Sequence, residues 1–152
     1  LWVGTDRGLA RWTHDELLPV PLGGGQMPRQ IDTITSDAAG GVWVFDAERG
    51  LLRWRRGEFV SVSMPESTGG ARVEAAFTDS HGHAWFALST GQVAVAAGDD
   101  IRVHGRADGL NAGVYQAFYE DHEQVLWLGG TAGLSRYAGG RFVTVRSDAG
   151  FP

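Results

Sequence analysis

The stretch DAAGGVWVFDAERGLLRW, residues 37–54, holds the pattern that decides the fold. A turn led by an aspartate precedes a short apolar run around Trp43, and Gly50 opens a second apolar run. Both runs have the usual length of a β-strand, and turn-forming residues separate them. The stretch therefore predicts two antiparallel strands joined by a tight turn.

The same pattern recurs along the chain at a nearly constant spacing. Tryptophans follow one another at intervals of 41, 42 and 42 residues, and an aspartate stands six residues before three of them. These structural repeat residues are Trp2, Trp43, Trp85 and Trp127, with Asp37, Asp79 and Asp121. A period near 42 indicates one structural unit that is copied along the chain.

Each full copy contains four candidate strands. In the second copy they cover residues 31–36, 41–46, 50–54 and 58–62, whereas the first copy contains only the last three strands. Four short antiparallel strands at this period are typical of one blade of a β-propeller. We therefore predict an all-β fold, a β-propeller fragment of about 3.5–4 four-stranded antiparallel blades from a ring expected to have seven.

The expected organisation is one partial β-propeller over residues 1–152. Its parts are an incomplete blade at 1–22, full blades at 29–62, 71–104 and 113–146, and the start of another linker at 147–152. Seven blades at this period need about 294 residues, so we expect the chain to be part of a longer protein. Because open blade faces are apolar, we also expect self-association or contact with the remainder of the propeller.

Composition and charge exclude several classes of partner. The formal net charge is −5, and the densest basic cluster is Arg53, Arg55 and Arg56, so no nucleic-acid partner and no contact with an anionic membrane are expected. No apolar stretch is long enough to span a bilayer. Cysteine is absent, which excludes disulfides and thiolate metal sites. With 43% hydrophobic residues, the chain is not expected to be disordered.

The repeat resembles the two-component regulator propeller repeat. The resemblance is carried by LWVGTDRGLARW (1–12), LWLGGTAGLSRY (126–137) and the stretch 37–54, with ADGLNAGV (107–114) as an inter-repeat linker. The third copy, 79–96, keeps the aspartate, glycine and tryptophan but loses the end of the motif. Nearly four copies in register cover essentially the whole chain.

This resemblance implies the periplasmic sensor region of a bacterial hybrid histidine kinase or of a related diguanylate-cyclase receptor. It implies a non-enzymatic segment that detects a polysaccharide-derived ligand or helps to dimerise the receptor, while the kinase or cyclase lies elsewhere in the protein. Two other functions stay open, because a fold does not determine a function: a metal-dependent propeller lyase or hydrolase, and a protein-interaction scaffold without a small ligand.

The candidate ligand-binding residues fall into two groups. Eleven residues before each tryptophan, on the innermost strand, stand Asp32, Glu74 and Gln116. Alternation along a strand turns one face toward the ring axis, so these three either line the central channel and contact a ligand or are simply hydrated. The second group belongs to the loops between the second and third strands and to the linkers: Arg7, Arg49 and Asn111. Loops are polar in any case, so this group is the weaker prediction.

The recurring aspartates and one histidine pair have the donor atoms of metal sites or catalytic acids. Recurrence in every copy favours a structural role for the aspartates, whose carboxylates would accept backbone N–H groups in the first turn. The pair His81-x-His83 could bind a metal, but no carboxylate has suitable spacing to complete a site. We therefore expect no catalytic residue, no metal and no cofactor in this segment.

Overall fold

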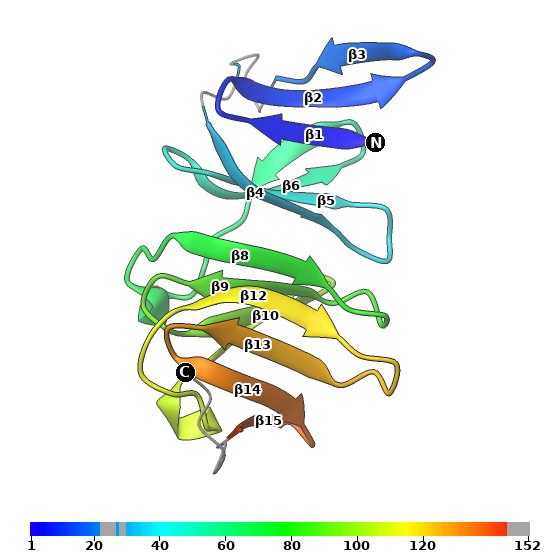
Figure 1. Cartoon of the computed structure of the whole chain (residues 1–152). Helices are drawn as coiled ribbons and strands as arrows, with labels where there is room; N and C mark the ends of the chain where they lie inside the picture. Colours follow the sequence, from blue (N-terminus) through cyan, green and yellow to red (C-terminus); the bar gives the residue numbers. More distant parts are fainter. Residues whose placement is uncertain (22–26, 28–29, 146–152) are drawn as a thin grey trace. The chain divides into compact units, whose positions relative to one another are not determined.

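The computed structural model describes residues 1–21, 27 and 30–145. The chain divides into two compact units, Leu1–Met64 and Pro65–Pro152. In the described residues each unit contains two antiparallel sheets, as Figure 1 shows, so the predicted all-β propeller fragment is confirmed. No helix in these ranges is long and apolar enough to cross a membrane. The expected linker start at 147–152 lies outside the described residues.

The first unit contains a three-stranded and a four-stranded sheet, each a simple meander. The three-stranded sheet has the order β1 (Trp2–Thr5), β2 (Gly8–Thr13) and β3 (Glu16–Pro19). The four-stranded sheet has the order β4 (Ile31–Ser36), β5 (Val42–Asp46), β6 (Gly50–Arg55) and β7 (Glu58–Ser61). The first copy therefore has the three strands that its sequence predicts.

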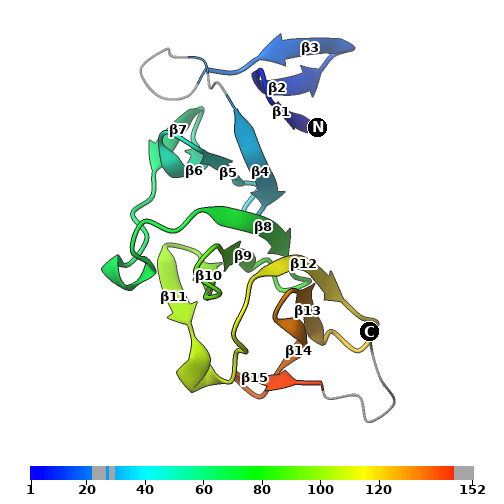
Figure 2. The same ribbon diagram turned by 60° about the vertical axis from the view of Figure 1, so that its left-hand side comes forward.

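The second unit contains two four-stranded meanders. The first has β8 (Val73–Thr78), β9 (Ala84–Leu88), β10 (Val93–Ala97) and β11 (Asp100–His104), and the second has β12 (Tyr115–Glu120), β13 (Leu126–Gly130), β14 (Gly133–Ala138) and β15 (Arg141–Thr144). Short 3-10 helices η1 (Glu66–Thr68) and η2 (Arg106–Asp108) precede β8 and β12. The first strands of the two sheets, β8 and β12, lie side by side in both ribbon views (Figure 1, Figure 2).

A tryptophan from one sheet packs against an aromatic pair of the next sheet in both units. In the first unit the Trp2 ring lies 5.1 Å from Trp54 and 5.9 Å from Phe59, measured between ring centroids. These two rings are cross-strand partners on β6 and β7. Edge-to-face packing of this kind adds to the burial of apolar surface, so it fastens one sheet to the next.

The second unit repeats this arrangement. Trp85 lies 5.0 Å from Tyr137 and 6.3 Å from Phe142, which are cross-strand partners on β14 and β15. The core of this unit also includes Leu128 and the completely buried Tyr115. A repeated sequence motif has thus become a repeated contact between sheets, as expected for blades that cannot bury both faces alone.

Candidate functional site

The candidate residues of the innermost strands all occupy the same structural position. Asp32, Glu74 and Gln116 each lie where the ladder between the first and second strands shifts register. Such a β-bulge leaves one residue outside the regular pairing, bends the strand and re-aims its side chain. The bulge recurs in every described four-stranded sheet, so it belongs to the repeat and offers a polar position in each copy.

The three bulge residues differ in their surroundings. Glu74 and Gln116 are exposed, whereas Asp32 is half-buried. The Gln30 side-chain amide donates a hydrogen bond of 2.6 Å to Oδ1 of Asp32. Glu74 lies on β8 and Gln116 on the neighbouring strand β12, so the second unit has an exposed carboxylate and an exposed amide at corresponding positions of two adjacent strands.

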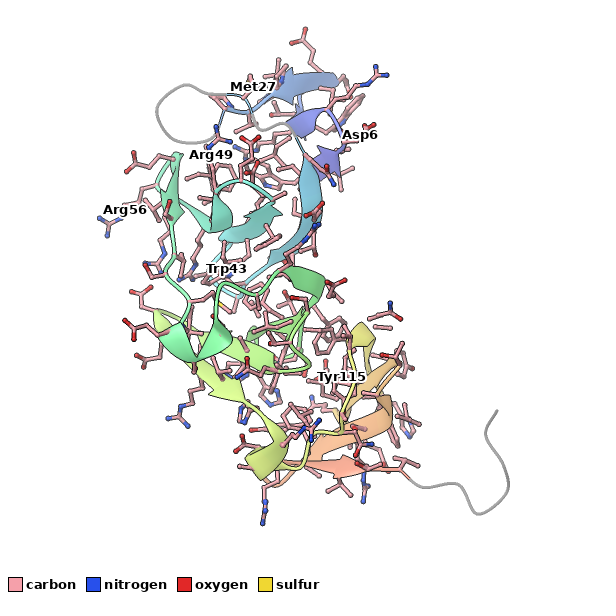
Figure 3. All side chains as sticks on the ribbon, turned by 90° about the vertical axis from the view of Figure 1, so that its left-hand side faces the viewer. Asp6, Met27, Trp43, Arg49, Arg56 and Tyr115 are labelled. Carbon is pink, nitrogen blue, oxygen red and sulfur yellow. The ribbon has the colours of Figure 1, made fainter. Side chains whose placement is uncertain are left out.

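Each bulge adjoins the turn between the second and third strands. In β4 the residue before the bulge, Ile31, pairs with Asp46, the last residue of β5. Arg49 follows in the β5–β6 turn, where Figure 3 shows its side chain, and its Nη1 lies 3.5 Å from Oδ2 of Asp46. The structure therefore brings Arg49 to the same end of the sheet as Asp32.

Asp46 is a structural residue whose role the sequence did not reveal. Its side chain is almost completely buried, and Oδ1 accepts the backbone N–H groups of Glu48 and Arg49 at 3.0 and 2.9 Å. In the first copy the Thr5 hydroxyl has the same role, because it accepts the backbone N–H of Arg7 in the corresponding turn at 3.1 Å. Threonine and aspartate side chains can both accept backbone N–H groups in such a turn. The occurrence of Thr5 and Asp46 at the same position of the repeat could therefore have predicted this role from the sequence.

A small cavity, lined by three polar residues and one alanine, lies at this end of the first unit. It has a volume of about 220 Å³, and its walls are Gln30, Asp46, Ala47 and Glu48. The Arg7 side chain of the β1–β2 turn is exposed to solvent. Carboxylate, amide and guanidinium groups are thus available at the turns, which suits a polar, hydroxyl-bearing ligand better than an apolar one.

Asn111, in contrast, holds its own linker in place. Its Oδ1 accepts the Thr144 hydroxyl at 2.9 Å, and its Nδ2 donates to the Ala132 carbonyl at 3.1 Å. Its backbone N–H donates to the hydroxyl of Tyr115, which lies inside the second unit in Figure 3 and is also bonded to Ser135 at 2.9 Å. These contacts make Asn111 an anchor between the linker and the sheet.

The recurring aspartates close the turn between the first and second strands. In all three turns Oδ1 accepts two backbone N–H groups, at positions two and four residues later, with distances of 2.8–3.0 Å. Oδ2 accepts the indole N–H of the tryptophan at 3.2, 2.8 and 2.7 Å for Asp37, Asp79 and Asp121. The aspartate and tryptophan columns of the repeat therefore form one hydrogen-bonded unit.

Two of these carboxylates also contact a cationic or titratable side chain. Asp37 accepts hydrogen bonds from the buried Arg53, with Nε at 2.8 Å. Asp79 lies 3.0 Å from Nδ1 of His83. Burial alone would raise the pKa of Asp79, but the N–H groups of Trp85 and His83 lower this pKa below its usual value of 3.8. The carboxylate is therefore ionised at neutral pH.

The histidines do not form a conventional metal centre. The rings of His81 and His83 stack with 6.0 Å between their centroids. His104, by contrast, packs against Trp85 and Phe142 in the interior of the second unit. In the part of the chain that the structure describes, no three His, Asp or Glu side chains are grouped so that they could hold a metal ion.

Comparison with known proteins gives structural matches only. No protein-family model and no curated protein matches the chain. The extracellular domain of a hybrid two-component system from B. thetaiotaomicron matches with a TM-score of 0.72 and 20% identity, covering 95% of this chain and 21% of that one. A second such domain from the same organism has a TM-score of 0.65 and 20% identity, covering 89% and 19%.

Virginiamycin B lyase from Staphylococcus aureus is also similar, with a TM-score of 0.70 and 13% identity. This match covers 97% of the present chain and 52% of the lyase. The chain thus spans about a fifth of each two-component domain and about half of the lyase. The likeness is one of fold, and it shows that the described segment is part of a propeller.

Proposed function

We propose that this segment is part of the periplasmic sensor propeller of a bacterial two-component receptor and that it catalyses no reaction itself. The structural likeness to two extracellular domains of such systems supports this proposal, as does the resemblance of the repeat motif. A rigid platform of stacked sheets can pass ligand binding to a receptor dimer through a shift in the population of its states. The histidine kinase or cyclase would lie in another part of the protein.

The proposed ligand is a polysaccharide fragment, and the recurring β-bulge is the observation that carries this proposal. A bulge positions a polar side chain at the same end of every described four-stranded sheet, next to the polar turns. In the second unit, Glu74 and Gln116 would bind sugar hydroxyl groups directly. In the first unit, Asp32 would do so, and Arg7 and Arg49 would add donors from the turns. Asn111 would act through the linker that it anchors.

Two other functions are weighed against this proposal. The similarity to virginiamycin B lyase favours a lyase as the second candidate, because that enzyme uses the same fold. The third candidate is a protein-interaction scaffold without a small ligand. The proposal also includes self-association of the isolated segment, or completion by the remainder of the propeller, through the exposed face of the first sheet.

Calorimetry and thermal-shift measurements with a panel of oligosaccharides separate these functions. We expect at least one oligosaccharide to bind, and Glu74→Ala and Gln116→Ala to weaken its binding without lowering Tm, because both side chains are exposed. Glu123→Ala is the matched control, since Glu123 is exposed in the first turn at the opposite end of the sheet. Turnover of a lactone or glycoside would favour an enzyme, and the absence of any oligosaccharide binding would favour a scaffold.

A further inference from the structure

Departures from the repeat gather at one place in the second unit. The third copy has His81 and His83 where the second copy has only Ala39 and Gly41. The fold needs the residues that recur in every full copy, such as the aspartate and the tryptophan, but it does not need these two imidazoles. A residue type found in one copy alone is therefore free to serve another purpose.

The neighbouring sheet departs from the repeat at the same place. Gln124 stands where Gly40 and Gly82 occupy the other turns, and it keeps their left-handed backbone with φ +61°. A non-glycine residue in this conformation carries strain of about 1–3 kcal/mol, and such strain gathers at functional sites. Gln124 and Glu120 line a cavity of about 280 Å³ together with His81 and His83.

The two histidines lie close to each other. They stand two residues apart in the turn that leads into β9, and both line the same cavity. Their ring centroids are 6.0 Å apart with 14° between the ring planes. Because the lone pair of an imidazole nitrogen lies in the ring plane, two nearly parallel rings must turn relative to each other before one ion can bond to a nitrogen of each at about 2.1 Å. His81 is exposed, so its ring can turn toward such an ion.

The Nδ1 atom of each ring already faces an oxygen partner. Nδ1 of His83 lies 3.0 Å from the Asp79 carboxylate, and Nδ1 of His81 lies 3.5 Å from the Ser80 hydroxyl. Ser80 is itself fixed by Glu120, which accepts its backbone N–H at 2.7 Å and its hydroxyl at 2.9 Å. Metal-binding histidines are oriented by partners of this kind, which leave the other ring nitrogen for the ion.

We propose that His81 and His83 bind a divalent transition-metal ion through their Nε2 atoms, with water in the remaining coordination positions. Imidazole favours Zn²⁺, Ni²⁺ and Cu²⁺ over Mg²⁺ and Ca²⁺, which prefer oxygen ligands. A third His, Asp or Glu ligand is not grouped with them in the described chain, so the ion exchanges readily and keeps open positions. The site lies at the first turn, at the opposite end of the sheet from the proposed sugar-binding residues.

The test uses the full chain and Ni²⁺ or Zn²⁺ alone. Calorimetry should show that His81→Asn and His83→Asn each weaken Zn²⁺ binding about tenfold or more, since each variant removes one ligand. Asparagine keeps a polar group near the position of Nδ1, and unchanged far-ultraviolet circular dichroism would show that the fold persists. His122→Asn is the matched control, because His122 is exposed in the corresponding turn beside Asp121. It should leave the affinity unchanged.

NMR spectroscopy locates the ion directly. Substoichiometric Ni²⁺ should broaden the ring resonances of His81 and His83 before those of His14 and His122. Equal broadening of all exposed histidines, or Zn²⁺ affinity that survives in the double variant, would overturn the proposal. Perturbation of the same two rings by an oligosaccharide but not by a metal would also overturn it, and would make the cavity a sugar site. Because no sugar is needed for the metal test, its result is independent of the proposed sensor role.

Discussion

At the residue scale, the aspartate and tryptophan of each repeat work as a pair. The carboxylate closes the first turn through backbone N–H groups, and it also fixes the indole ring that packs against the next sheet. One side chain therefore links a local turn to contact between sheets. These two structural roles explain why Asp37, Asp79 and Asp121 recur with a fixed offset from the tryptophans. The explanation requires neither metal binding nor catalysis.

Replacement of Asp37 should be costly because its partner Arg53 is buried. Asp37→Ala would leave the guanidinium without its carboxylate, and we expect the free energy of unfolding to fall by about 3–5 kcal/mol. In Asp37→Ala/Arg53→Leu much of this loss should return, since no buried cation remains. Urea unfolding followed by circular dichroism measures both variants, with the exposed Asp6→Ala as a control within about 0.5 kcal/mol of wild type. Arg53→Leu alone is measured in the same way, and a double variant whose loss of stability equals the sum of the two single losses would contradict the pairing.

The indole N–H should set the acidity of Asp121. Hydrogen bonds from Trp127, first, and from the backbone of Val125 lower the pKa of Asp121 below 3.8. A carboxyl whose pKa is lowered on folding adds stability above its unfolded pKa, and this contribution is lost as the pH falls through the folded value. An NMR titration of Trp127→Phe should therefore show the Asp121 pKa moving up toward 3.8. An unchanged titration would mean that the indole bond is absent in solution.

At the scale of elements, the position of each bulge is the feature on which the proposed ligand site depends. Strand bounds followed from alternation and turn residues: the predicted strand 31–36 is β4, and the predicted 50–54 is β6 with one residue more. The bulges could not be predicted in this way, because a register shift depends on how two strands pair and not on the sequence pattern of either strand alone. For the same reason the sequence marked Asp32, Glu74 and Gln116 as a column but did not show that each lies outside regular pairing.

The backbone at the end of β13 lies very close to the backbone at the start of β12, and this approach can be tested by substitution. A Cβ added at Gly130 would lie 2.2 Å from the Val114 carbonyl oxygen and 2.8 Å from the Cα of Tyr115. Gly130→Ala should therefore lower the free energy of unfolding by about 1–3 kcal/mol, as overpacking does. At the adjacent Gly129 nothing lies within 4 Å, so Gly129→Ala is the matched control. Equal effects of the two variants in urea unfolding would contradict the described approach of the linker.

At the scale of the whole molecule, the first sheet presents an aromatic face like those that are covered elsewhere. Trp12 and Leu17 are cross-strand partners with 48% and 50% exposure. In two other sheets the position of Leu17 is taken by Phe59 and Phe142, which are only 5% and 3% exposed. These two rings are covered because a tryptophan from the preceding sheet packs against each of them and its cross-strand partner. An apolar face of this kind attracts another blade, either from the remainder of the ring or from a second copy.

Self-association through this face should depend on Leu17 more than on its neighbour. Leu18 is almost equally exposed at 45%, but it points to the other face of β3. In sedimentation at micromolar concentration, Leu17→Glu should reduce self-association of the isolated chain, and Leu18→Glu should reduce it less. A wild-type chain that sediments as a monomer, or an equal response to both changes, would contradict the prediction.

The repeat made the overall architecture predictable, but the contacts of the candidate site residues could not be predicted as well. Regular spacing marked the tryptophans as structural repeat residues, and in the structure Trp2 and Trp85 pack against the neighbouring sheet. Asn111 was predicted as a ligand-binding residue because it belongs to an inter-repeat linker, yet its side chain bonds Thr144 and Ala132, which are distant in sequence. Contacts between residues that are distant in sequence cannot be predicted from a single sequence, whereas a repeated motif can be aligned with its own copies.

The central claim is that a tryptophan of one blade packs against the aromatic pair of the next blade, and proton NMR tests it most directly. The account predicts nuclear Overhauser effects between the Trp85 indole and the rings of Tyr137 and Phe142, whose centroids lie 5.0 and 6.3 Å away. A folded chain with β-sheet chemical shifts but none of these cross-peaks would contradict the blade packing.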